Sequence, residues 1–349
     1  MNMKKKKRVM MVGSAEQSAG GVASVIRLMK KMPFWEERRC YWLGTQIQRN
    51  YAWKLWYAAK AAVIAPFIMW KYDIVHFHTV PDVLGLIIQM PELLLAKLYG
   101  KKVVIEVHVG NQLNDNTENR LFKWVLRRAN LVLFLAKRWE RLFKEKYTDV
   151  DVETAVLYNA CDSVEDVPME EKEKSIIMAA YFNENKAPDI LLKAWKRIKD
   201  RHPDWRVTMM GNGEVERYKQ MSEEMGLADS VMFTGYITGQ KKMDIWRKAS
   251  IYCMCSYNEG FPMVVLEAWA HKVAVVTTPV GGLPDVIEEG KNCLTFPFGD
   301  DEALAEQMER LIVDKNLRKK IGEDSYILVN KNFSLKHIND ELSVLYNKV

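Results

Sequence analysis

Two glutamates, Glu259 and Glu267, stand eight positions apart in one short segment and have different surroundings. Glu259 lies in a turn rich in Gly and Pro, whereas Glu267 lies in an apolar run, from Met263 to Ala270, that predicts a buried helix. A carboxylate inside such a helix is costly unless another group satisfies it. A ligand with paired hydroxyls would satisfy Glu267, and so would an ion pair with an Arg or Lys distant in the sequence.

Other residues suited to binding or chemistry stand where a predicted strand ends or a helix begins. Lys186 would neutralise a phosphate as a point charge, or it is simply a solvated loop lysine. His108 shares a strand face with Glu106 and is either a site residue or a satisfied core histidine. The helix start after Pro262 leaves N–H groups that suit an anion. Close backbone approach to a ligand is expected at Gly20, Gly21, Gly211 and Gly260.

Candidate metal ligands alternate along two of the predicted strands. His76 and His78 share one face of the first, and Glu106 and His108 share one face of the second. A metal-dependent hydrolase would need further His or carboxylate ligands and an open coordination position. The chain has six histidines in all, so we expect no metal and keep the hydrolase as the lesser alternative.

Short apolar runs alternate with amphipathic stretches along the whole chain. Apolar strands separated by helices predict parallel sheets covered on both faces. We therefore predict an α/β protein with two doubly wound, Rossmann-like domains, residues 1–165 and 166–333, and a last helix over residues 334–349 that packs back on the first domain. The predicted strands are Arg8–Val12, Asp73–Phe77, Lys102–Val109, Leu131–Leu135, Thr154–Leu157, Ser175–Ala180, Trp205–Met210, Ser230–Phe233, Ser250–Cys255, Val273–Thr277 and Cys293–Phe296.

The net charge of +6 is unevenly divided along the chain. Residues 1–165 contain 26 Lys or Arg and 16 Asp or Glu, whereas the rest contains 25 and 29. A basic first half indicates an anionic partner, such as phosphates, nucleic acid or an acidic membrane surface. We expect no nucleic acid, because no interleaved aromatic platform accompanies the charge. Five scattered cysteines without a C-x-x-C pair favour a reduced, cytoplasmic protein.

The stretch from Tyr51 to Trp70 is rich in Trp, Tyr and Lys. Lys54, Lys60 and Pro66 interrupt it too often for a membrane-spanning helix. A core helix is our first interpretation. The alternative is a helix that lies in the plane of a membrane surface, which would make the protein peripheral on the inner face of the cell membrane.

The segment from Asn258 to Ala268 resembles the E-x7-E motif of retaining GT-B glycosyltransferases, specifically glycosyltransferase family 4, or group 1. The following segments Val275–Ile287 and Gly290–Leu294 are similar to the next blocks of the family. Asp73–His78 and the Gly20–Gly21 loop match its N-terminal half more loosely. The resemblance implies the GT-B fold, with two domains facing each other across a cleft, and transfer of a hexose-type sugar from a nucleoside diphosphate sugar.

The resemblance also implies roles for single residues. Glu267 would hold the ribose hydroxyls of the nucleotide, and Lys186 would bind its diphosphate. Glu259 and His108 would contact the donor sugar beside the reacting bond. The other predicted donor-binding positions are Gly20, Gly21, Gly211, Gly260, Phe261, Met263 and Val264. Such an enzyme needs no metal and no cofactor, because the nucleotide sugar is a substrate.

Four positions depart from the family pattern. Tyr181 stands where the family usually has Arg, and a Gly is usual or common at the positions of Ala187, Pro262 and Cys293. One cation beside the diphosphate is therefore missing, which keeps a non-catalytic GT-B partner subunit as an alternative. Because both glutamates and the lysine are retained, we predict an active enzyme that uses UDP rather than GDP and acts on a saccharide or lipid-linked saccharide in surface polysaccharide synthesis.

Overall fold

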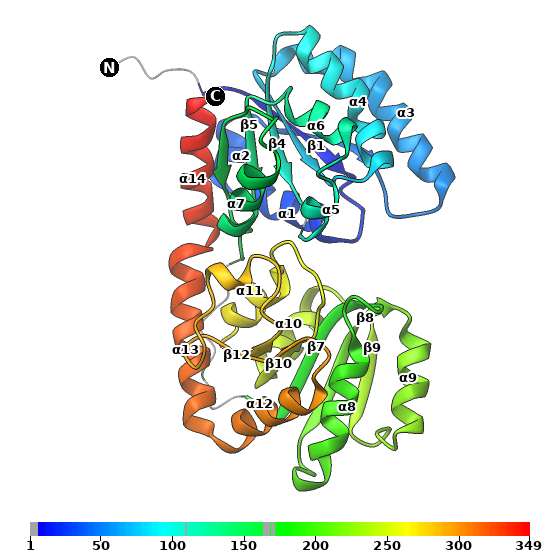
Figure 1. Cartoon of the computed structure of the whole chain (residues 1–349), viewed down its shortest axis with the longest axis vertical. Coiled ribbons are helices and arrows are strands. Elements are labelled where there is room, and N and C mark those ends of the chain that lie inside the picture. The colour runs from blue at the N-terminus through cyan, green and yellow to red at the C-terminus, as the bar shows by residue number, and fades with distance from the viewer. Residues whose placement is uncertain (1–5, 109, 163–167, 169–171) are drawn as a thin grey trace. The chain divides into compact units, whose positions relative to one another are not determined.

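The computed structural model describes residues 6–108, 110–162, 168 and 172–349. The chain divides into two compact units, which we describe separately (Figure 1). Unit 1 comprises residues 1–160 and 333–349, and unit 2 comprises residues 161–332. The predicted domain boundary after residue 165 lies outside the described residues.

Unit 1 contains a parallel six-stranded sheet in the order β2-β1-β3-β4-β5-β6. Its strands are β1 (Val9–Ser14), β2 (Tyr41–Gln46), β3 (Ile74–Thr79), β4 (Lys102–Val107), β5 (Leu131–Phe134) and β6 (Thr154–Val156). Its helices are α1 (Gly21–Lys30), α2 (Pro33–Glu37), α3 (Tyr51–Ile68), α4 (Val83–Leu98), α5 (Gln112–Asp115), α6 (Arg120–Leu126), α7 (Lys137–Lys146) and the C-terminal α14 (Leu335–Lys348).

Unit 2 contains a second parallel sheet in the order β12-β11-β10-β7-β8-β9. Its strands are β7 (Ser175–Phe182), β8 (Arg206–Gly213), β9 (Val231–Gly235), β10 (Ile251–Met254), β11 (Ala274–Thr277) and β12 (Leu294–Thr295). Its helices are α8 (Pro188–Ile198), α9 (Val215–Glu224), α10 (Gly239–Lys248), α11 (Met263–Ala270), α12 (Asp301–Val313) and α13 (Lys315–Asn332).

The central strands explain why the fold class was predictable. Every residue of β3, β5, β10 and β11 is buried, as expected for parallel strands covered by helices on both faces. The prediction of two doubly wound α/β domains is confirmed. The last helix, α14, packs within unit 1, where the Asn339 side chain accepts a hydrogen bond from the Phe34 N–H at 2.9 Å.

One strand was not predicted. β2 forms the edge of the first sheet beside β1, and its residues alternate between buried and partly exposed positions. Gly44 interrupts its apolar pattern because an added Cβ would lie 2.8 Å from the Ala15 Cα. Gly44, Thr45 and Gln46 follow Leu43 in this strand, so it lacks the continuous apolar run by which the other strands were found.

The first interpretation of Tyr51–Trp70 as a core helix is wrong. In α3 the buried residues are two small ones, Ala61 and Ala65. Its large apolar side chains face outward, and Phe67 is 72% exposed. Among the described residues, no helix has the length and apolar character required to cross a membrane.

Candidate functional site

In unit 2 the structure joins two of the predicted site residues directly. The Lys186 ammonium donates a short hydrogen bond to Glu259 Oε1, and Ser256 Oγ donates to the same oxygen at 2.7 Å. The two side chains are mostly enclosed, with 23% of Lys186 and 13% of Glu259 exposed. An ammonium with three donors and a carboxylate thus meet at the carboxyl ends of β7 and β10, where ligands bind in this type of sheet.

Backbone contacts hold the loops that carry this pair. Asn185 accepts a hydrogen bond from the Tyr257 N–H at 2.8 Å, and its side chain donates to the Asn258 carbonyl at 3.0 Å. The residue after Lys186, Ala187, has a left-handed φ of 45°. This conformation costs an L-residue about 1–2 kcal/mol, which explains why a glycine is usual at this position.

A second loop supports the backbone of Glu259. Gly282 donates its N–H to the Gly260 carbonyl at 2.8 Å. Gly281 has a φ of 67°, and a Cβ there would lie 2.8 Å from the Glu259 carbonyl oxygen. Glycine is therefore required at position 281 for close packing of two backbones, independently of any ligand.

Helix α11 begins directly after this loop and presents one open face. Met263, Val264 and Glu267 are half-buried, whereas most of the remaining helix residues are buried. Positions three and four apart share a face of a helix, so Glu267 lies on the same side as the first two helical residues. The prediction that α11 is buried on all sides is therefore only partly right.

Glu267 has an ion-pair partner that was not identified from the sequence. Lys242 on α10 places its ammonium 2.8 Å from each carboxylate oxygen. The two side chains are about equally exposed, 31% and 30%. Glu267 therefore forms an ion pair with a lysine distant in the sequence, which was one of the two alternatives. Its role in binding a ribose stays a prediction.

Gly211 and Tyr181 lie at the carboxyl ends of neighbouring strands. Gly211 pairs with Ala180 and has a φ of 154°, and a Cβ there would lie 1.7 Å from the Ala180 carbonyl oxygen. Sheet packing alone therefore requires this glycine. The Tyr181 side chain is 58% exposed, so the position where an Arg is usual is open to solvent.

The remaining predicted residues, Gly20, Gly21 and His108, belong to unit 1. Gly20 caps α1 with a φ of 117°, and Gly21 is the first helical residue. A Cβ on Gly21 would meet nothing within 4 Å, so its backbone is open to close approach. His108 directly follows β4, one residue after the strand ends.

Behind His108 lies a buried cluster of three histidines and one glutamate. His78 and Glu106 face each other in the register of β3 and β4, and His76 and His108 lie two positions away on the same faces. His108 Nε2 lies 3.0 Å from Glu106 Oε1 and 2.9 Å from His78 Nδ1. His76 Nε2 lies 3.4 Å from Glu106 Oε2, and His76 Nδ1 lies 2.6 Å from the Tyr346 hydroxyl of α14.

Burial and charge determine the protonation of this cluster. Burial lowers the pKa of His78 to about 4, so its ring is neutral near pH 7. Burial alone would raise the pKa of Glu106, but the nearby His78 and His108 rings, the hydrogen bond from His108 and the His76 ring 3.4 Å away outweigh it and hold that pKa well below its usual range. The cluster therefore surrounds an ionised carboxylate.

The spacing within this cluster would also suit a metal ion. Ligand atoms of His76, His78 and Glu106 all lie within 4.8 Å of one another. The side chains of these three residues are at most 1% exposed, although His76 Nε2, His78 Nε2 and Glu106 Oε2 are buried without a hydrogen-bond partner among the described residues. A hydrolytic metal needs an open position for water, which so enclosed a cluster does not offer.

Sequence reasoning missed Lys242, Ser256 and Tyr346. Lys242 lies on α10 and Glu267 on α11, whereas Ser256 lies three residues before Glu259 in the same loop. Tyr346 follows His76 by 270 positions. One signal was present for Tyr346, because the last helix was expected to pack on the first domain. Nothing in the sequence marks which of its side chains reaches the sheet.

Comparison with known proteins supports the reading of unit 2. Residues 162–327 match the family model described as glycosyl transferases group 1. A D-inositol 3-phosphate glycosyltransferase of Corynebacterium jeikeium is 34% identical over 146 residues, 40% of this chain and 35% of that protein. A Campylobacter jejuni protein named GalNAc-alpha-(1->4)-GalNAc-alpha-(1->3)-diNAcBac-PP-undecaprenol alpha-1,4-N-acetyl-D-galactosaminyltransferase is 27% identical over 194 residues, 53% of this chain and 52% of that protein.

The chain thus spans little more than a third of the length of the first of these relatives, and about half of the second. Solved structures match over almost its whole length. Anabaena HepE in complex with UDP-glucose has a TM-score of 0.77 at 16% identity, covering 98% of this chain and 100% of that one. Sucrose-phosphate synthase of Thermosynechococcus elongatus has a TM-score of 0.81 at 16% identity, covering 98% and 99%. The chain has the GT-B fold, and its second unit matches the group 1 glycosyl transferases.

Proposed function

We propose that this protein is a retaining glycosyltransferase that moves a hexose-type sugar from a nucleoside diphosphate sugar to a saccharide or lipid-linked saccharide. The observation that carries the proposal is the Lys186–Glu259 pair at the carboxyl edge of the second sheet, with Glu259 inside the segment that matches the group 1 family model. UDP is favoured over GDP because HepE, which shares the fold, binds UDP and UDP-glucose. A lipid-linked acceptor is favoured by the undecaprenol-linked substrate named for the Campylobacter relative.

The proposed chemistry places growing negative charge near Lys186. As the bond between sugar and phosphate loosens, charge accumulates on the leaving diphosphate. The Lys186 ammonium and the N-terminal end of α11 would stabilise that charge. The acceptor hydroxyl would attack from the face that the diphosphate leaves, and the departing phosphate would take its proton. Glu259 would hold the donor sugar, and Glu267 would accept hydrogen bonds from the ribose hydroxyls.

We further propose that no metal takes part. Lys186 and the α11 N-terminus can supply the positive field that a divalent cation supplies in other transferases. The histidine cluster of unit 1, by contrast, is too enclosed to bring a metal-bound water to a substrate. The metal-dependent hydrolase is therefore the weaker alternative, and the non-catalytic partner subunit is the second.

Titration calorimetry with UDP and a turnover assay with UDP-sugars test the proposal. Glu267→Ala should weaken UDP binding at least tenfold, because two hydrogen bonds to a charged group are lost at about 1.5–3 kcal/mol each. Lys186→Ala should lower kcat about 10²–10³-fold, the usual loss of one charge-stabilising donor.

Lys193→Ala is the matched control for these variants. Lys193 forms an ion pair with Asp189 on α8, also in unit 2, and is not a predicted site residue. It should leave both UDP affinity and kcat unchanged. If Glu267→Ala and Lys186→Ala behave like this control, the site is misassigned. UDP binding without transfer or donor hydrolysis would instead favour the partner subunit.

We also propose that unit 1 docks on an anionic membrane through α3 and α4. These two helices pack against each other along one side of the unit (Figure 1). Each carries a stripe of exposed apolar side chains at helical spacing. The α3–α4 surface, as we call it, consists of Trp56, Val63, Phe67 and Trp70 on α3 and the segment after it, and Val83, Ile87, Leu94 and Leu98 on α4.

Positive charge borders this apolar surface. Lys60, Lys71 and Lys97 are exposed on the same two helices or beside them. The Lys71 ammonium lies 5.5 Å from the centre of the Trp70 ring, so its charge stands at the edge of the apolar stripe. Each basic residue near an anionic bilayer contributes about 1 kcal/mol, and an apolar face inserts into the headgroup region. Apolar stripes bordered by lysines favour anionic lipid over a neutral protein partner.

Sedimentation with vesicles tests this surface. The protein should bind vesicles containing anionic lipid at low salt, lose most binding at high salt, and bind neutral vesicles little. Phe67→Glu should abolish binding, and charge reversal of Lys54 and Lys60 should weaken it. Ile327→Glu is the control, because Ile327 is similarly exposed but lies in unit 2. If the protein stays in the supernatant at low salt, or if Phe67→Glu converts a dimer to a monomer instead, the membrane assignment fails.

A further inference from the structure

The histidine cluster of unit 1 connects His108, which follows β4, to the C-terminal helix. Three of its side chains, those of His76, His78 and Glu106, are at most 1% exposed, whereas 7% of His108 is exposed. His108 is therefore the one member of the cluster through which it meets solvent. The hydrogen bonds that the cluster makes to the His108 ring depend on which atoms of the cluster carry protons.

The proton positions follow from the donors and acceptors present. Tyr346 is buried, and burial raises the pKa of its hydroxyl well above its usual range, so it remains an O–H donor. Its acceptor is His76 Nδ1 at 2.6 Å, which is nearer and stronger than the Met11 sulfur at 3.9 Å. His76 then carries its own proton on Nε2, the atom that faces Glu106 Oε2 at 3.4 Å.

The same reasoning assigns the proton of His108. Glu106 is ionised and can only accept, and its Oε1 lies 3.0 Å from His108 Nε2. His108 Nε2 must therefore carry the hydrogen. The second neighbour of that nitrogen, His78 Nδ1 at 2.9 Å, then also accepts. The neutral His78 ring carries its proton on Nε2, which is buried without a hydrogen-bond partner among the described residues. When the His108 ring carries one proton, its lone pair is therefore on Nδ1.

We propose that Glu106 is a positioning residue that holds His108 in the Nε2–H tautomer, so that Nδ1 accepts a hydrogen bond from a hydroxyl of the donor sugar. The tautomer follows from the geometry of unit 1 alone, whereas its use on a sugar rests on the proposed function. Tyr346 and His76 lie on the other side of Glu106, where Tyr346 holds His76 by a hydrogen bond at 2.6 Å and His76 Nε2 lies 3.4 Å from Glu106 Oε2. The C-terminal helix thereby contacts the cluster that holds a predicted site residue.

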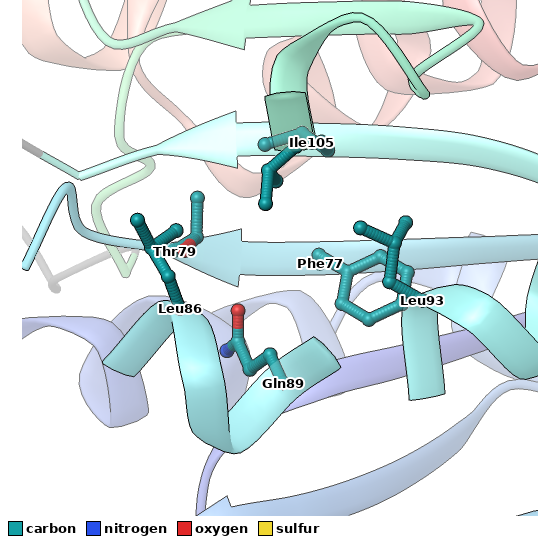
Figure 2. A pocket seen from close by; sticks show the side chains of 7 residues that line it. Phe77, Thr79, Leu86, Gln89, Leu93 and Ile105 are labelled. Carbon is teal, nitrogen blue, oxygen red and sulfur yellow. The ribbon is translucent and has the colours of Figure 1, made fainter. Parts of the chain in front are cut away.

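The other face of the same strands is packed so that the cluster cannot easily relax. Figure 2 shows Leu86, Gln89 and Leu93 of α4 directed toward Phe77, Thr79 and Ile105 of β3 and β4. The space left between them, about 10 Å³, holds at most about one water molecule. The Gln89 side chain donates to the His78 carbonyl at 3.0 Å, which fixes the strand from behind.

Nitrogen NMR of the histidine rings tests the tautomer without any substrate. In protein labelled with ¹⁵N-histidine, the wild-type His108 should be protonated at Nε2, with the resonance assigned by its loss in His108→Gln. Glu106→Gln keeps the shape of the side chain but replaces an ionised acceptor with a neutral amide. Because the acceptor for Nε2–H is then weaker, His108 should move partly or wholly to the Nδ1–H form. Glu92→Gln is the control, because Glu92 is equally buried but lies on α4, which packs on the opposite face of the sheet.

Kinetics separate positioning from a merely structural role. Glu106→Gln should lower kcat for sugar transfer about 10–100-fold, as loss of a residue that orients a ligand does in metal sites, while UDP affinity stays within twofold. Glu92→Gln should leave kcat, UDP affinity and the His108 tautomer unchanged.

Four results would overturn the proposal: an Nδ1–H tautomer in the wild type, an unchanged tautomer in Glu106→Gln, an equal loss of kcat in Glu92→Gln, or a stoichiometric zinc ion bound at His108 Nε2 in place of the proton. Failure of the proposed function would appear differently, as absence of UDP binding by the wild type.

Discussion

Replacing Glu259 with glutamine should strengthen the binding of UDP and weaken sugar transfer at the same time. In the structure, Lys186 donates to Glu259, the carboxylate predicted to hold the donor sugar. In the proposed function the same ammonium binds the diphosphate. A phosphate must therefore compete with Glu259 for Lys186, and the neutral glutamine removes that competition and the repulsion between two anions.

The burial of the pair sets the size of the effect. Exposed ion pairs contribute about 0.2–1 kcal/mol, whereas hydrogen bonds to charged groups in enclosed positions contribute about 1.5–3 kcal/mol. With 23% and 13% of the side chains exposed, the Lys186–Glu259 pair lies between these cases. A gain of about 1–2 kcal/mol corresponds to UDP binding about 5- to 30-fold tighter.

Calorimetry with UDP and with a UDP-sugar checks this prediction. UDP should bind Glu259→Gln more tightly than it binds the wild type, whereas kcat with the sugar donor should fall at least tenfold because a sugar contact is lost. Glu288→Gln is the control, since Glu288 forms an exposed pair with Lys291 at 2.8 Å in the same unit. Weaker or unchanged UDP binding by Glu259→Gln would show that Lys186 does not exchange a carboxylate for a phosphate.

Two further predictions concern metal and pH. Transfer activity should survive excess EDTA, and a loss that Mg²⁺ or Mn²⁺ restores would contradict the metal-free mechanism. Burial raises the pKa of Glu92 to about 7, and both carboxylate oxygens lack a hydrogen-bond partner among the described residues. The folded state therefore keeps a proton that the unfolded chain releases near pH 4.5, so stability should fall as the pH rises from about 5 to about 7. Glu92→Gln should remove this loss, and its advantage in thermal unfolding over wild type should grow to about 3 kcal/mol by pH 8; a pH-independent difference would refute the argument.

Eleven of the twelve strands were found by their apolar runs. The central strands β3, β5, β10 and β11 are buried along their whole length, as expected for parallel strands covered on both faces. The edge strands β6, β9 and β12 were found as well, whereas the edge strand β2 was missed because Gly44, Thr45 and Gln46 break its apolar run. The GT-B fold was then reached by resemblance rather than by pattern, and the structural neighbours confirm it.

Hydropathy alone misjudged α3. Its composition is that of a core helix, but its buried residues are the two small alanines, Ala61 and Ala65. A sequence records how apolar a helix is and not what covers it, so a core helix and a membrane-surface helix share the same signal. The neighbouring stripe on α4, which argues most strongly for an apolar partner, could be recognised only when the two helices were seen to pack together.

The charged residues show more clearly what local sequence can and cannot identify. Glu267 stood out because a carboxylate is costly in an apolar run, and that cost can be read from the local sequence. Glu259 stood out by its position in a turn, eight residues before Glu267. Their partners Lys186 and Lys242 have polar neighbours in the sequence, so nothing local distinguishes them from other lysines. Lys186 was found through the family resemblance, and Lys242 was not found.

The histidine cluster could be identified only in part from the sequence. The alternation of His76 with His78, and of Glu106 with His108, showed that each pair shares a strand face, but the pairing of the two faces depends on strand register. A slip of one residue between β3 and β4 would turn Glu106 to the opposite face and leave His108 without an anionic partner. The register is fixed by the apolar packing on the far side of the sheet, where Phe77 and Ile105 meet α4 (Figure 2). Residues far from any donor thus determine which nitrogen of His108 carries the proton, and a sequence read locally has no access to that dependence.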